Sequence, residues 1–366
     1  MKIDFSELKR QYDMHASEYE ETVLRALRSG WYIMGNELKD FENKFGEYLG
    51  MPYVIGVNSG LDALILAVRA LNIGPGDEVI VPANTYIASV LAVTENGATP
   101  VFVEPDAFHC IDASRIEETI TERTKAILPV HLYGQACQMD VICDIAKKYN
   151  LYIIEDCAQS HGATFKGQLT GTFGSIGCFS FYPTKPLGAL GDSGAIAVKD
   201  KDLADKLYAM RNYGSHVKYV NDIVGVNSRL DEVQAAALKV GLSHLDEGNE
   251  IRRKIAESYF LGIKNPLVQL PVTREGNYHV YHVFAIMSEY RDQLQKYLED
   301  NGIHTLMHYP IPPHMQKCYE YLGHKEGDFP IAERYAKTLL SLPIYVGMTM
   351  EEVEYVINMI NSFKVE

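Results

Sequence analysis

Lys185 stands in a sequence setting that can turn an ordinary surface cation into a nucleophile. It follows an apolar run at residues 176–182 and precedes a glycine-rich stretch at residues 188–194. The run predicts a buried strand, and the glycines predict a tight, closely packed loop. An amine in such a crowded place loses hydration, which lowers its pKa and leaves it nucleophilic near neutral pH.

A carboxylate, Asp156, follows a second apolar run at residues 151–155. A carboxylate at the end of a buried strand requires a cation or good hydrogen bonds. Backbone amides would satisfy a purely structural aspartate. A protonated pyridine nitrogen would satisfy it equally well, and the carboxylate would keep that ring cationic and electron-withdrawing.

Three further features complete a candidate cofactor site. Ser59 and Gly60 follow a predicted strand at 53–57 and begin a helix, so free amides and the positive helix end converge there, as at many anion sites. Ser180 ends the strand before Lys185. Lys185 for an aldehyde, Asp156 for a ring nitrogen and these serines for a phosphate are the parts that pyridoxal 5'-phosphate requires.

Two more side chains fit the same cofactor. Tyr86 follows the strand predicted at 78–81 and can stack on the ring face, and Gln159 can hydrogen-bond the ring hydroxyl. Each feature is common by itself. Their placement at successive strand ends makes the combination informative, because ligands of parallel sheets bind at the carboxyl ends of the strands.

The elements that must position these residues alternate along the chain. Continuously apolar strands, typical of a sheet buried on both faces, alternate with helices of about ten residues. Beyond strands at 53–57 and 78–81, we expect strands at 100–103, 126–132, 151–155, 176–182 and 194–198, and helices at 37–49, 87–95, 112–121, 138–149 and 201–211. The pattern predicts an α/β fold with a mostly parallel central sheet and helices on both faces.

The character of the chain changes near residue 245. Helices at 228–245 and 247–261 precede strand-like segments at 267–271 and 279–287, which flank a Gly276-Asn277 turn, and a helix at 293–301. We predict a large domain over residues 1–245, including an N-terminal arm, and a smaller C-terminal α+β domain over 246–366.

Composition restricts the class of protein. The 34 basic and 48 acidic residues give a net charge of −14, which argues against a nucleic-acid surface. Neither a signal peptide nor a membrane span is recognisable, and the six cysteines form no CxxC pair. We expect a cytoplasmic protein without a metal site, bound to neither nucleic acid nor membrane.

The chain resembles the DegT/DnrJ/EryC1/StrS sugar aminotransferases, which have the fold-type I aspartate aminotransferase architecture. The resemblance extends over essentially the whole sequence. The matching motifs lie at residues 58–64 (NSGLDAL), 82–86 (PANTY), 130–134 (VHLYG), 155–163 (EDCAQSHGA), 180–185 (SFYPTK) and 225–230 (GVNSRL).

This resemblance implies specific cofactor contacts. Lys185 forms the Schiff base and moves the proton between substrate and cofactor, while Asp156 pairs with the pyridine nitrogen. The other implied contacts are Gln159 at the ring hydroxyl, Tyr86 on the ring, and Ser59, Gly60, Leu61 and Ser180 at the phosphate. Asn227 reaches that phosphate from the other subunit, which implies a homodimer with shared sites.

The resemblance also implies a substrate. The run at 308–314 (HYPIPPH) looks like the substrate loop of 3-aminotransferases acting on dTDP-3-keto-6-deoxyhexoses. The implied substrate-binding residues are Tyr182, Arg229, His308, Tyr309 and His314. L-Glutamate would donate the amine, and the product would be a 3-amino-3,6-dideoxyhexose for a surface polysaccharide such as lipopolysaccharide O-antigen, or for a glycosylated metabolite.

Two alternatives stay open. A UDP- or GDP-linked 4-keto sugar would keep the chemistry and change the substrate, and the 308–314 run is the sequence feature against it. A non-catalytic relative that retains the fold is the second alternative, and Lys185 argues against that one.

Overall fold

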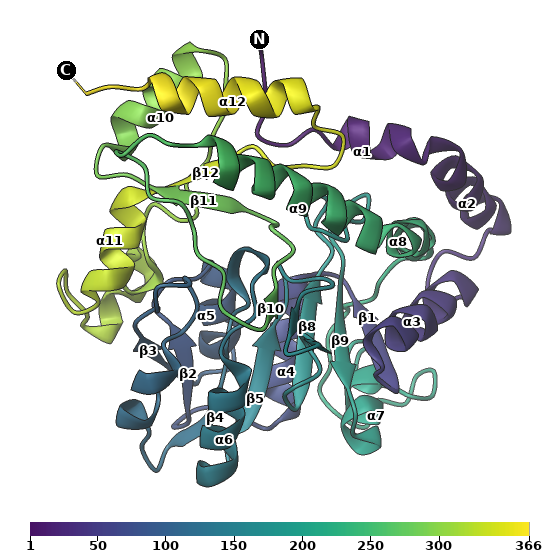
Figure 1. The fold of residues 1–366 in the computed structure, drawn as a ribbon. Coiled ribbons are helices and arrows are strands. Elements are labelled where there is room, and N and C mark those ends of the chain that lie inside the picture. The colour runs from purple at the N-terminus through teal and green to yellow at the C-terminus, as the bar shows by residue number, and fades with distance from the viewer. Residues whose placement is uncertain (366) are drawn as a thin grey trace.

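The centre of the fold is a seven-stranded sheet with the order β1-β9-β8-β5-β4-β2-β3 (Figure 1). The computed structural model describes residues 1–365. The pairs from β8 through β5, β4 and β2 to β3 are parallel, whereas β9 is antiparallel to both β1 and β8. The strands are β1 (Tyr53–Val57), β2 (Glu78–Pro82), β3 (Thr99–Val103), β4 (Thr124–Ile127), β5 (Tyr152–Asp156), β8 (Ile176–Ser180) and β9 (Gly194–Val198). The expected mostly parallel sheet is confirmed.

The reversal of β9 follows from the segment that precedes it. Parallel neighbours need a crossover connection, usually a helix, but residues 181–193 between β8 and β9 contain none. These residues turn back directly at the end of β8, and Lys185 lies in this turn. The irregular connection therefore keeps the lysine at the edge of the sheet where β8 ends.

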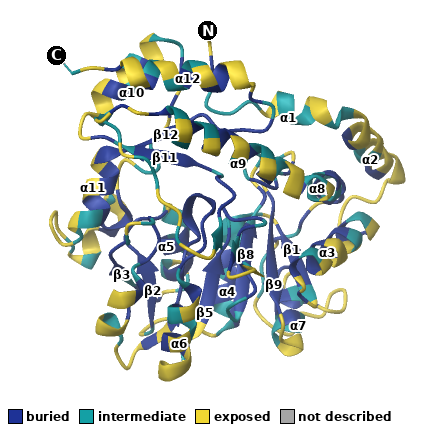
Figure 2. Cartoon of the chain, in the orientation of Figure 1, coloured by how far each residue is buried: buried dark blue, intermediate teal, exposed yellow. Residues whose placement is uncertain are grey.

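Helices cover both faces of the sheet, as Figure 2 shows by the dark, buried strands between them. Apolar side chains of α4, α5 and α7 pack on one face. Those of α3 and α8 pack against β1, β8 and β9 on the other face, where α6 covers the remaining strands. The helices are α3 (Asn36–Leu49), α4 (Gly60–Ala70), α5 (Ile87–Thr94), α6 (Met139–Tyr149), α7 (Lys201–Met210) and α8 (Glu232–Ser243).

The C-terminal part builds its own core around a two-stranded sheet of β11 and β12. Its elements are α9 (Leu245–Gly262), β10 (Asn277–Tyr278), β11 (Phe284–Met287), α10 (Arg291–Asp300), α11 (Pro330–Thr338), β12 (Leu339–Leu342) and α12 (Met350–Ser362). The division at residues 245 and 246 stays a prediction, and it falls in the first turn of α9.

The N-terminal arm joins the C-terminal part. Ile3 is buried in the C-terminal core and bridges to Ile303, and Arg10 donates to both carboxylate oxygens of Glu352, at 2.7 and 2.8 Å. Two helices, α1 (Leu8–Met14) and α2 (Ala16–Ser29), then lead toward α8 and α3 (Figure 1). Among the described residues, none of the helices combines the length and apolar character needed to cross a bilayer.

Three expected elements differ in the structure. Residues 112–121 form two short 3₁₀ turns, Ala113–Arg115 and Glu117–Thr119, because the Asp112 carboxylate accepts from the Ser114 amide and favours a local turn. The strand expected at 126–132 ends at Ile127, two residues before Pro129, which has no N–H for a ladder.

The strand-like segments expected at 267–271 and 279–287 are much shorter in the structure, where β11 (Phe284–Met287) is the strand of the second segment. Asn277 and Tyr278 form β10, which pairs with β6 (Thr164–Phe165), and β6 also pairs with β7 (Gln168–Leu169). Residues 267–271 contribute one bridge, from Gln269 to Met287. Between the two halves of this antiparallel bridge, the chain reaches β6 through β10.

Candidate active site

The carboxyl ends of β1, β5 and β8 bring the predicted cofactor residues to one edge of the sheet. Asp156 is the last residue of β5 and Ser180 the last of β8, and Ser59 follows the end of β1 by two residues. Because these strands run in one direction, their carboxyl ends meet at the same edge. The site therefore lies at the carboxyl edge of the central sheet.

Asp156 is a buried carboxylate held by two protein hydrogen bonds. The Ser89 hydroxyl donates to Oδ2 at 2.8 Å, and the Ala158 amide donates to Oδ1 at 3.1 Å. Burial raises the pKa of Asp156, while these hydrogen bonds and the charges of Lys185 and His131 oppose the increase. The remaining lone pairs of this carboxylate are available for a cation.

Lys185 lies in the same electrostatic environment. Burial lowers the pKa of its amine to about 8, although the Asp156 carboxylate counteracts this effect. Burial is also the main reason why the pKa of His161 falls to about 3 and that of His308 to about 4, and the Lys185 charge lowers both further. The Lys185 charge therefore acts both on Asp156 at the end of β5 and on His308 in the predicted substrate loop.

The start of α4 forms the predicted phosphate cradle. The Ser59 side chain caps the helix by accepting from the Asp62 amide at 3.0 Å. Gly60 packs so closely on Ser180 that a Cβ at position 60 would lie 2.5 Å from the Ser180 Cβ. Leu61 is the next residue of this first turn. The free amides of the helix start and the Ser180 side chain therefore share one small space.

Tyr86, Gln159 and Tyr309 meet across the site. The ring centroids of Tyr86 and Tyr309 are 5.2 Å apart. Gln159 accepts from the Tyr133 amide at 2.6 Å and donates from Nε2 to the Tyr309 hydroxyl at 3.1 Å. The Tyr133 hydroxyl donates to the carbonyl of His308, so this part of the 308–314 run reaches the predicted cofactor residues.

The structure does not bring His314 to this group. Its ring is buried between Phe102 and Phe329, and Nε2 lies 3.2 Å from a carboxylate oxygen of Glu333 on α11. These contacts give His314 a packing function at the far end of the 308–314 run.

Tyr182 and Asn227 lie at the surface, whereas Arg229 is half-buried. Arg229 donates to the Asn212 side chain at 3.3 Å, and its guanidinium lies over the Tyr213 ring. The Lys185 amide donates to the carbonyl of Tyr182 at 2.8 Å, whereas the side chains of Arg229 and Asn227 form no hydrogen bond with Lys185 or Asp156 among the described residues.

The residues at this edge suit pyridoxal phosphate. Within residues 1–365, no cationic side chain hydrogen-bonds the buried Asp156 carboxylate, and no carboxylate forms an ion pair with Lys185. A bound pyridinium and an aldehyde would satisfy both groups, and the α4 amides with Ser180 offer donors for a phosphate. When bound, the cofactor supplies an electron-withdrawing ring for amino transfer.

Sequence reasoning gave no role to Ser89, Thr85 and His131, although Thr85 and His131 lie in the motifs at 82–86 and 130–134. The Ser89 hydroxyl donates to Asp156, and the Thr85 hydroxyl lies 2.9 Å from that of Ser89. The amide of His131 donates to the carbonyl of Asp156 at 3.0 Å. Thr85 lies before the N-cap of α5, so no helical spacing in the sequence predicts its contact with Ser89.

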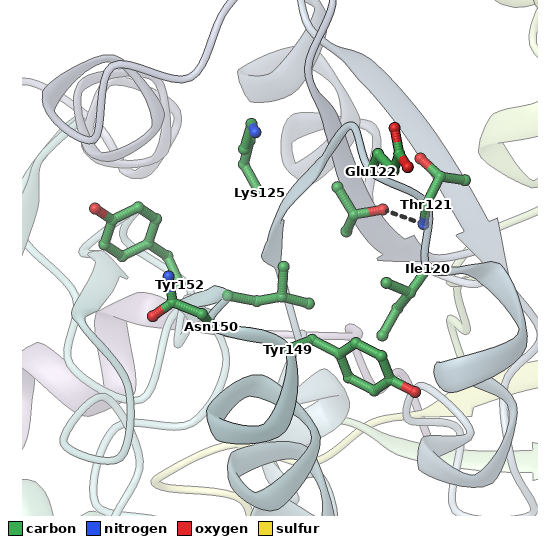
Figure 3. Close-up of a pocket in the computed structure, with 9 residues that line it drawn as sticks. Ile120, Thr121, Glu122, Lys125, Tyr149, Asn150 and Tyr152 are labelled. Atoms are coloured by element: carbon green, nitrogen blue, oxygen red, sulfur yellow. Dashed lines mark hydrogen bonds between the residues drawn. The ribbon is translucent and has the colours of Figure 1, made fainter.

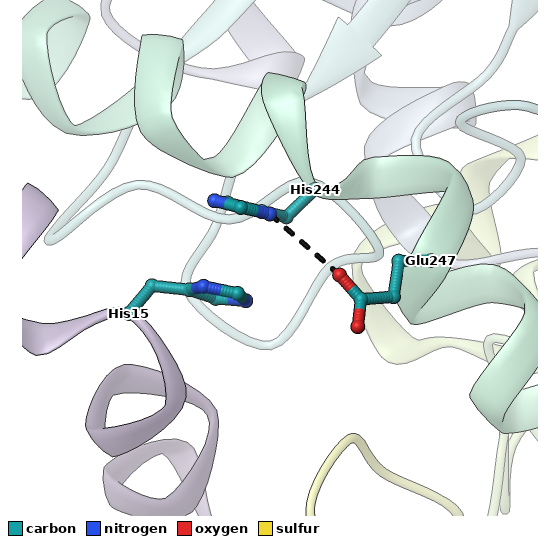
Figure 4. A group of neighbouring side chains, drawn as sticks. All are labelled: His15, His244 and Glu247. Carbon is teal, nitrogen blue, oxygen red and sulfur yellow. Dashed lines mark ion pairs between the residues drawn. The ribbon is translucent and has the colours of Figure 1, made fainter.

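Two other groups carry metal-ligand side chains. In the buried group of His131, Glu155 and Cys157, the Cys137 amide donates to His131 Nδ1 and the amides of Gly171, Phe173 and Gly174 donate to Glu155, which uses the lone pairs a metal would need. His15 and His244 stack at 3.5 Å beside Glu247, with nearly parallel rings (Figure 4). Nitrogen lone pairs lie in the ring planes, so this stacked arrangement does not aim both histidines at one ion.

A surface hollow lies at the opposite edge of the sheet, where β4 and β5 begin (Figure 3). Ile120, Lys125, Tyr149 and Tyr152 are among its lining residues. None of the predicted site residues lines it, so it is separate from the candidate active site.

Comparisons with known proteins agree with the fold and with the expected cofactor. The chain matches the DegT/DnrJ/EryC1/StrS aminotransferase family over residues 13–361. It is 53% identical over 362 residues to a dTDP-3-amino-3,6-dideoxy-alpha-D-galactopyranose transaminase of Aneurinibacillus thermoaerophilus, with 99% of each chain covered.

Two solved structures are similar throughout. Streptomyces venezuelae DesV superposes with a TM-score of 0.97 at 45% identity, covering 100% of both chains. NtdA from Bacillus subtilis, with its cofactor PMP bound, superposes with a TM-score of 0.91 at 34% identity, covering 98% of this chain and 84% of that one.

Fold, site and relatives together define an aminotransferase that uses pyridoxal phosphate. The chain belongs to the DegT/DnrJ/EryC1/StrS aminotransferase family, as the motifs predicted.

Proposed function

We propose that this enzyme transfers an amino group from L-glutamate to C3 of a dTDP-linked 3-keto-6-deoxyhexose. The name of the Aneurinibacillus relative, at 53% identity over nearly the whole chain, is the observation that carries the choice of substrate. The product, a 3-amino-3,6-dideoxyhexose, suits a surface polysaccharide such as O-antigen, and we place the enzyme in the cytoplasm, where sugar nucleotides are made.

The proposed cofactor contacts follow the geometry at the strand ends. Lys185 carries the cofactor and moves the proton at the reacting carbon, because burial leaves part of its amine neutral near pH 8. Asp156 holds the ring nitrogen in its protonated form. Gln159 contacts the ring hydroxyl with its remaining amide hydrogen, and Tyr86 lies on the ring face.

The proposed phosphate contacts are Ser59, Gly60, Leu61 and Ser180. The close approach of Gly60 to Ser180 supports this assignment because it concentrates donors at one helix start. We assign the sugar nucleotide to Tyr182, Arg229, His308 and Tyr309. We leave His314 out because its contacts with Glu333 and Phe329 explain its burial.

We further propose a homodimer in which Asn227 reaches the partner's phosphate site. Large apolar side chains are exposed on two segments that flank this region of the surface. Trp31 and Tyr32 are 56% and 50% exposed, and Tyr219 and Val224 are 87% and 86% exposed in the loop that leads to Asn227. Burial of such side chains in a partner is the common reason for their exposure in a single chain.

A substrate assay tests the proposed reaction. Purified enzyme is incubated with L-glutamate and either a dTDP-3-keto-6-deoxyhexose or a UDP- or GDP-linked 4-keto sugar, and the aminated product is measured by mass spectrometry. We expect amination of the 3-keto sugar. Preferential amination of a 4-keto sugar would replace the substrate assignment and keep the chemistry, while no amination of either sugar would support a non-catalytic protein.

A mixing experiment tests the shared site. Lys185→Ala and Asn227→Ala variants, each weakly active alone, are unfolded together, refolded as a mixture and assayed. A dimer with shared sites restores activity, because a mixed dimer contains one site with both native residues. Activity no higher than the sum of the two variants, in a mixture proven to contain mixed dimers, would reject the placement of Asn227.

A further inference from the structure

Thr85, Ser89 and Asp156 form a buried chain of hydrogen bonds behind the cofactor site. The Ser89 and Asp156 side chains are joined at 2.8 Å, and the Thr85 and Ser89 hydroxyls lie 2.9 Å apart. All three residues are at most 5% exposed. A polar chain of this kind in the core is costly unless every member has its partner.

The direction of each hydrogen bond follows from the number of protons. An ionised carboxylate only accepts hydrogen bonds, so the single hydroxyl proton of Ser89 is donated to Asp156 Oδ2. Thr85 must then be the donor in its contact with Ser89. The chain therefore runs from Thr85 through Ser89 to the carboxylate, and each link is strengthened by the negative charge at its end.

We propose that Ser89, oriented by Thr85, is a positioning residue that fixes the rotation of the Asp156 carboxylate and keeps it ionised opposite the cofactor ring nitrogen. This rests on the cofactor placement under the proposed function. With the Ala158 amide on Oδ1 and Ser89 on Oδ2, both oxygens are anchored from the protein side. The carboxylate then has one orientation to offer to the ring.

The sequence provides the geometry through α5. Tyr86 is the N-cap of this helix, so Thr85 comes before it and Ser89 lies in its first turn. Tyr86 is 54% exposed while Ser89 is buried. The N-cap Tyr86 has an extended backbone, so its side chain does not follow the helical pattern that places Ser89. One helix start therefore contributes the ring-facing tyrosine and the support for the aspartate beneath the ring.

Other charged groups around Asp156 set the conditions of a test. Burial raises its pKa, and Lys185 and His131 lower it together with Ser89 and the Ala158 amide. Glu155 precedes it on β5, but its carboxylate faces the amides of Gly171, Phe173 and Gly174. Removal of Ser89 changes one of these contributions and leaves every charge in place.

The experiment compares Ser89→Ala, Ser89→Thr and Thr85→Val with wild type as holoenzymes. The pH titration of the cofactor's visible absorbance and the cofactor dissociation constant are measured by spectroscopy. A matched control is Ser160→Ala, since Ser160 is also fully buried and its hydroxyl lies 2.9 Å from that of Thr170. Thermal unfolding of every variant separates loss of fold from loss of positioning.

We expect Ser89→Ala to weaken cofactor binding on the order of 10-fold, the scale of one hydrogen bond to a charged group, and to shift the absorbance titration. Ser89→Thr restores both values, Thr85→Val gives a smaller change of the same sign, and Ser160→Ala keeps the wild-type titration.

Two results would overturn the proposal. One is a Ser89→Ala variant that titrates and binds the cofactor like Ser160→Ala. The other, if Ser89→Ala does not fold, is a Thr85→Val variant with the wild-type titration.

Lys185→Ala separates this failure from a failure of the proposed site. If Lys185→Ala loses the wild-type absorbance and Ser89→Ala keeps it unshifted, only the positioning is wrong. If Lys185→Ala retains the wild-type absorbance, the cofactor placement itself is wrong.

Discussion

The amide of Gln159 donates a hydrogen bond to the hydroxyl of Tyr309 over 3.1 Å, joining residues that are 150 positions apart in the chain. Gln159 follows the end of β5, whereas Tyr309 belongs to the 308–314 run of the C-terminal part. A residue assigned to the cofactor thus contacts a residue assigned to the sugar nucleotide. A substitution at Tyr309 therefore tests whether the proposed cofactor site and the proposed sugar-nucleotide site are coupled.

Tyr309→Phe removes that hydrogen bond and keeps the ring beside Tyr86. The variant also lacks the hydroxyl that we assign to the sugar nucleotide. One lost neutral hydrogen bond to that substrate corresponds to about 1 kcal/mol, so we expect KM for the sugar nucleotide to rise roughly 5-fold. Cofactor absorbance remains that of wild type. Tyr321→Phe, at an exposed tyrosine of the same part of the chain, serves as the control. An unchanged KM in Tyr309→Phe would remove Tyr309 from the substrate site.

His314→Phe tests the packing function of His314. The phenyl ring can pack between Phe102 and Phe329 but loses the hydrogen bond to Glu333. We expect the free energy of unfolding to fall by about 1–3 kcal/mol, because the Glu333 carboxylate loses a partner. KM for the sugar nucleotide stays unchanged. A raised KM at wild-type stability would instead return His314 to the substrate site.

Gly60→Ala tests the phosphate cradle. The new Cβ would lie 2.5 Å from the Ser180 Cβ, so α4 and β8 must move apart where the phosphate donors converge. Overpacking of this kind costs about 1–3 kcal/mol, and we expect cofactor affinity to fall about 10-fold or more. Gly74→Ala, whose Cβ would meet only the Asn96 carbonyl at 3.5 Å, is the control. Equal cofactor affinities in the two variants would count against the cradle.

Buried histidines predict a loss of apoenzyme stability in acid. Burial lowers the pKa of His109 and His308 to about 4 and that of His161 and His279 to about 3. The unfolded chain, with histidine pKa values near 6.5, therefore binds more protons between about pH 4 and 6.5. The free energy of unfolding must fall as pH decreases through this window, by at most about 1.4 kcal/mol per pH unit for each histidine. Asp106, whose pKa burial raises to about 6, partly opposes this trend.

His109→Asn checks this dependence, since asparagine accepts the positive φ of 65° found at position 109. We expect a shallower slope of unfolding free energy against pH in urea titrations between pH 4.5 and 6.5. His216→Asn, at an exposed position, leaves the slope unchanged. An equal slope in the His109 variant and wild type would mean that His109 takes up no proton on unfolding.

The sequence predicted the cofactor edge of the sheet because strand ends and polar residues coincide along the chain. Asp156, Ser180 and Ser59 each follow an apolar run, and the structure places all three at one edge. Apolar runs carry no information on direction, so the reversal of β9 was not predictable from its own residues. It depended on the helix-free connection that holds Lys185.

The contacts that sequence reasoning missed are those made between distant or unremarkable residues. Ser89 is a small polar residue in an apolar helix, and the residues around it do not predict its hydrogen bond to the Asp156 carboxylate. His314 was assigned with His308 because the two share one short run. The run crosses from the site to α11, so its two ends have different surroundings.

The most direct test of the central assignment is chemical trapping at Lys185. The holoenzyme is reduced with borohydride, digested and analysed by mass spectrometry, with Lys185→Ala treated in parallel. We predict that the reduced cofactor is found on the peptide containing Lys185 and is absent from the variant. Recovery of the cofactor on any other lysine, or its retention in covalent form by Lys185→Ala, would contradict the assignment.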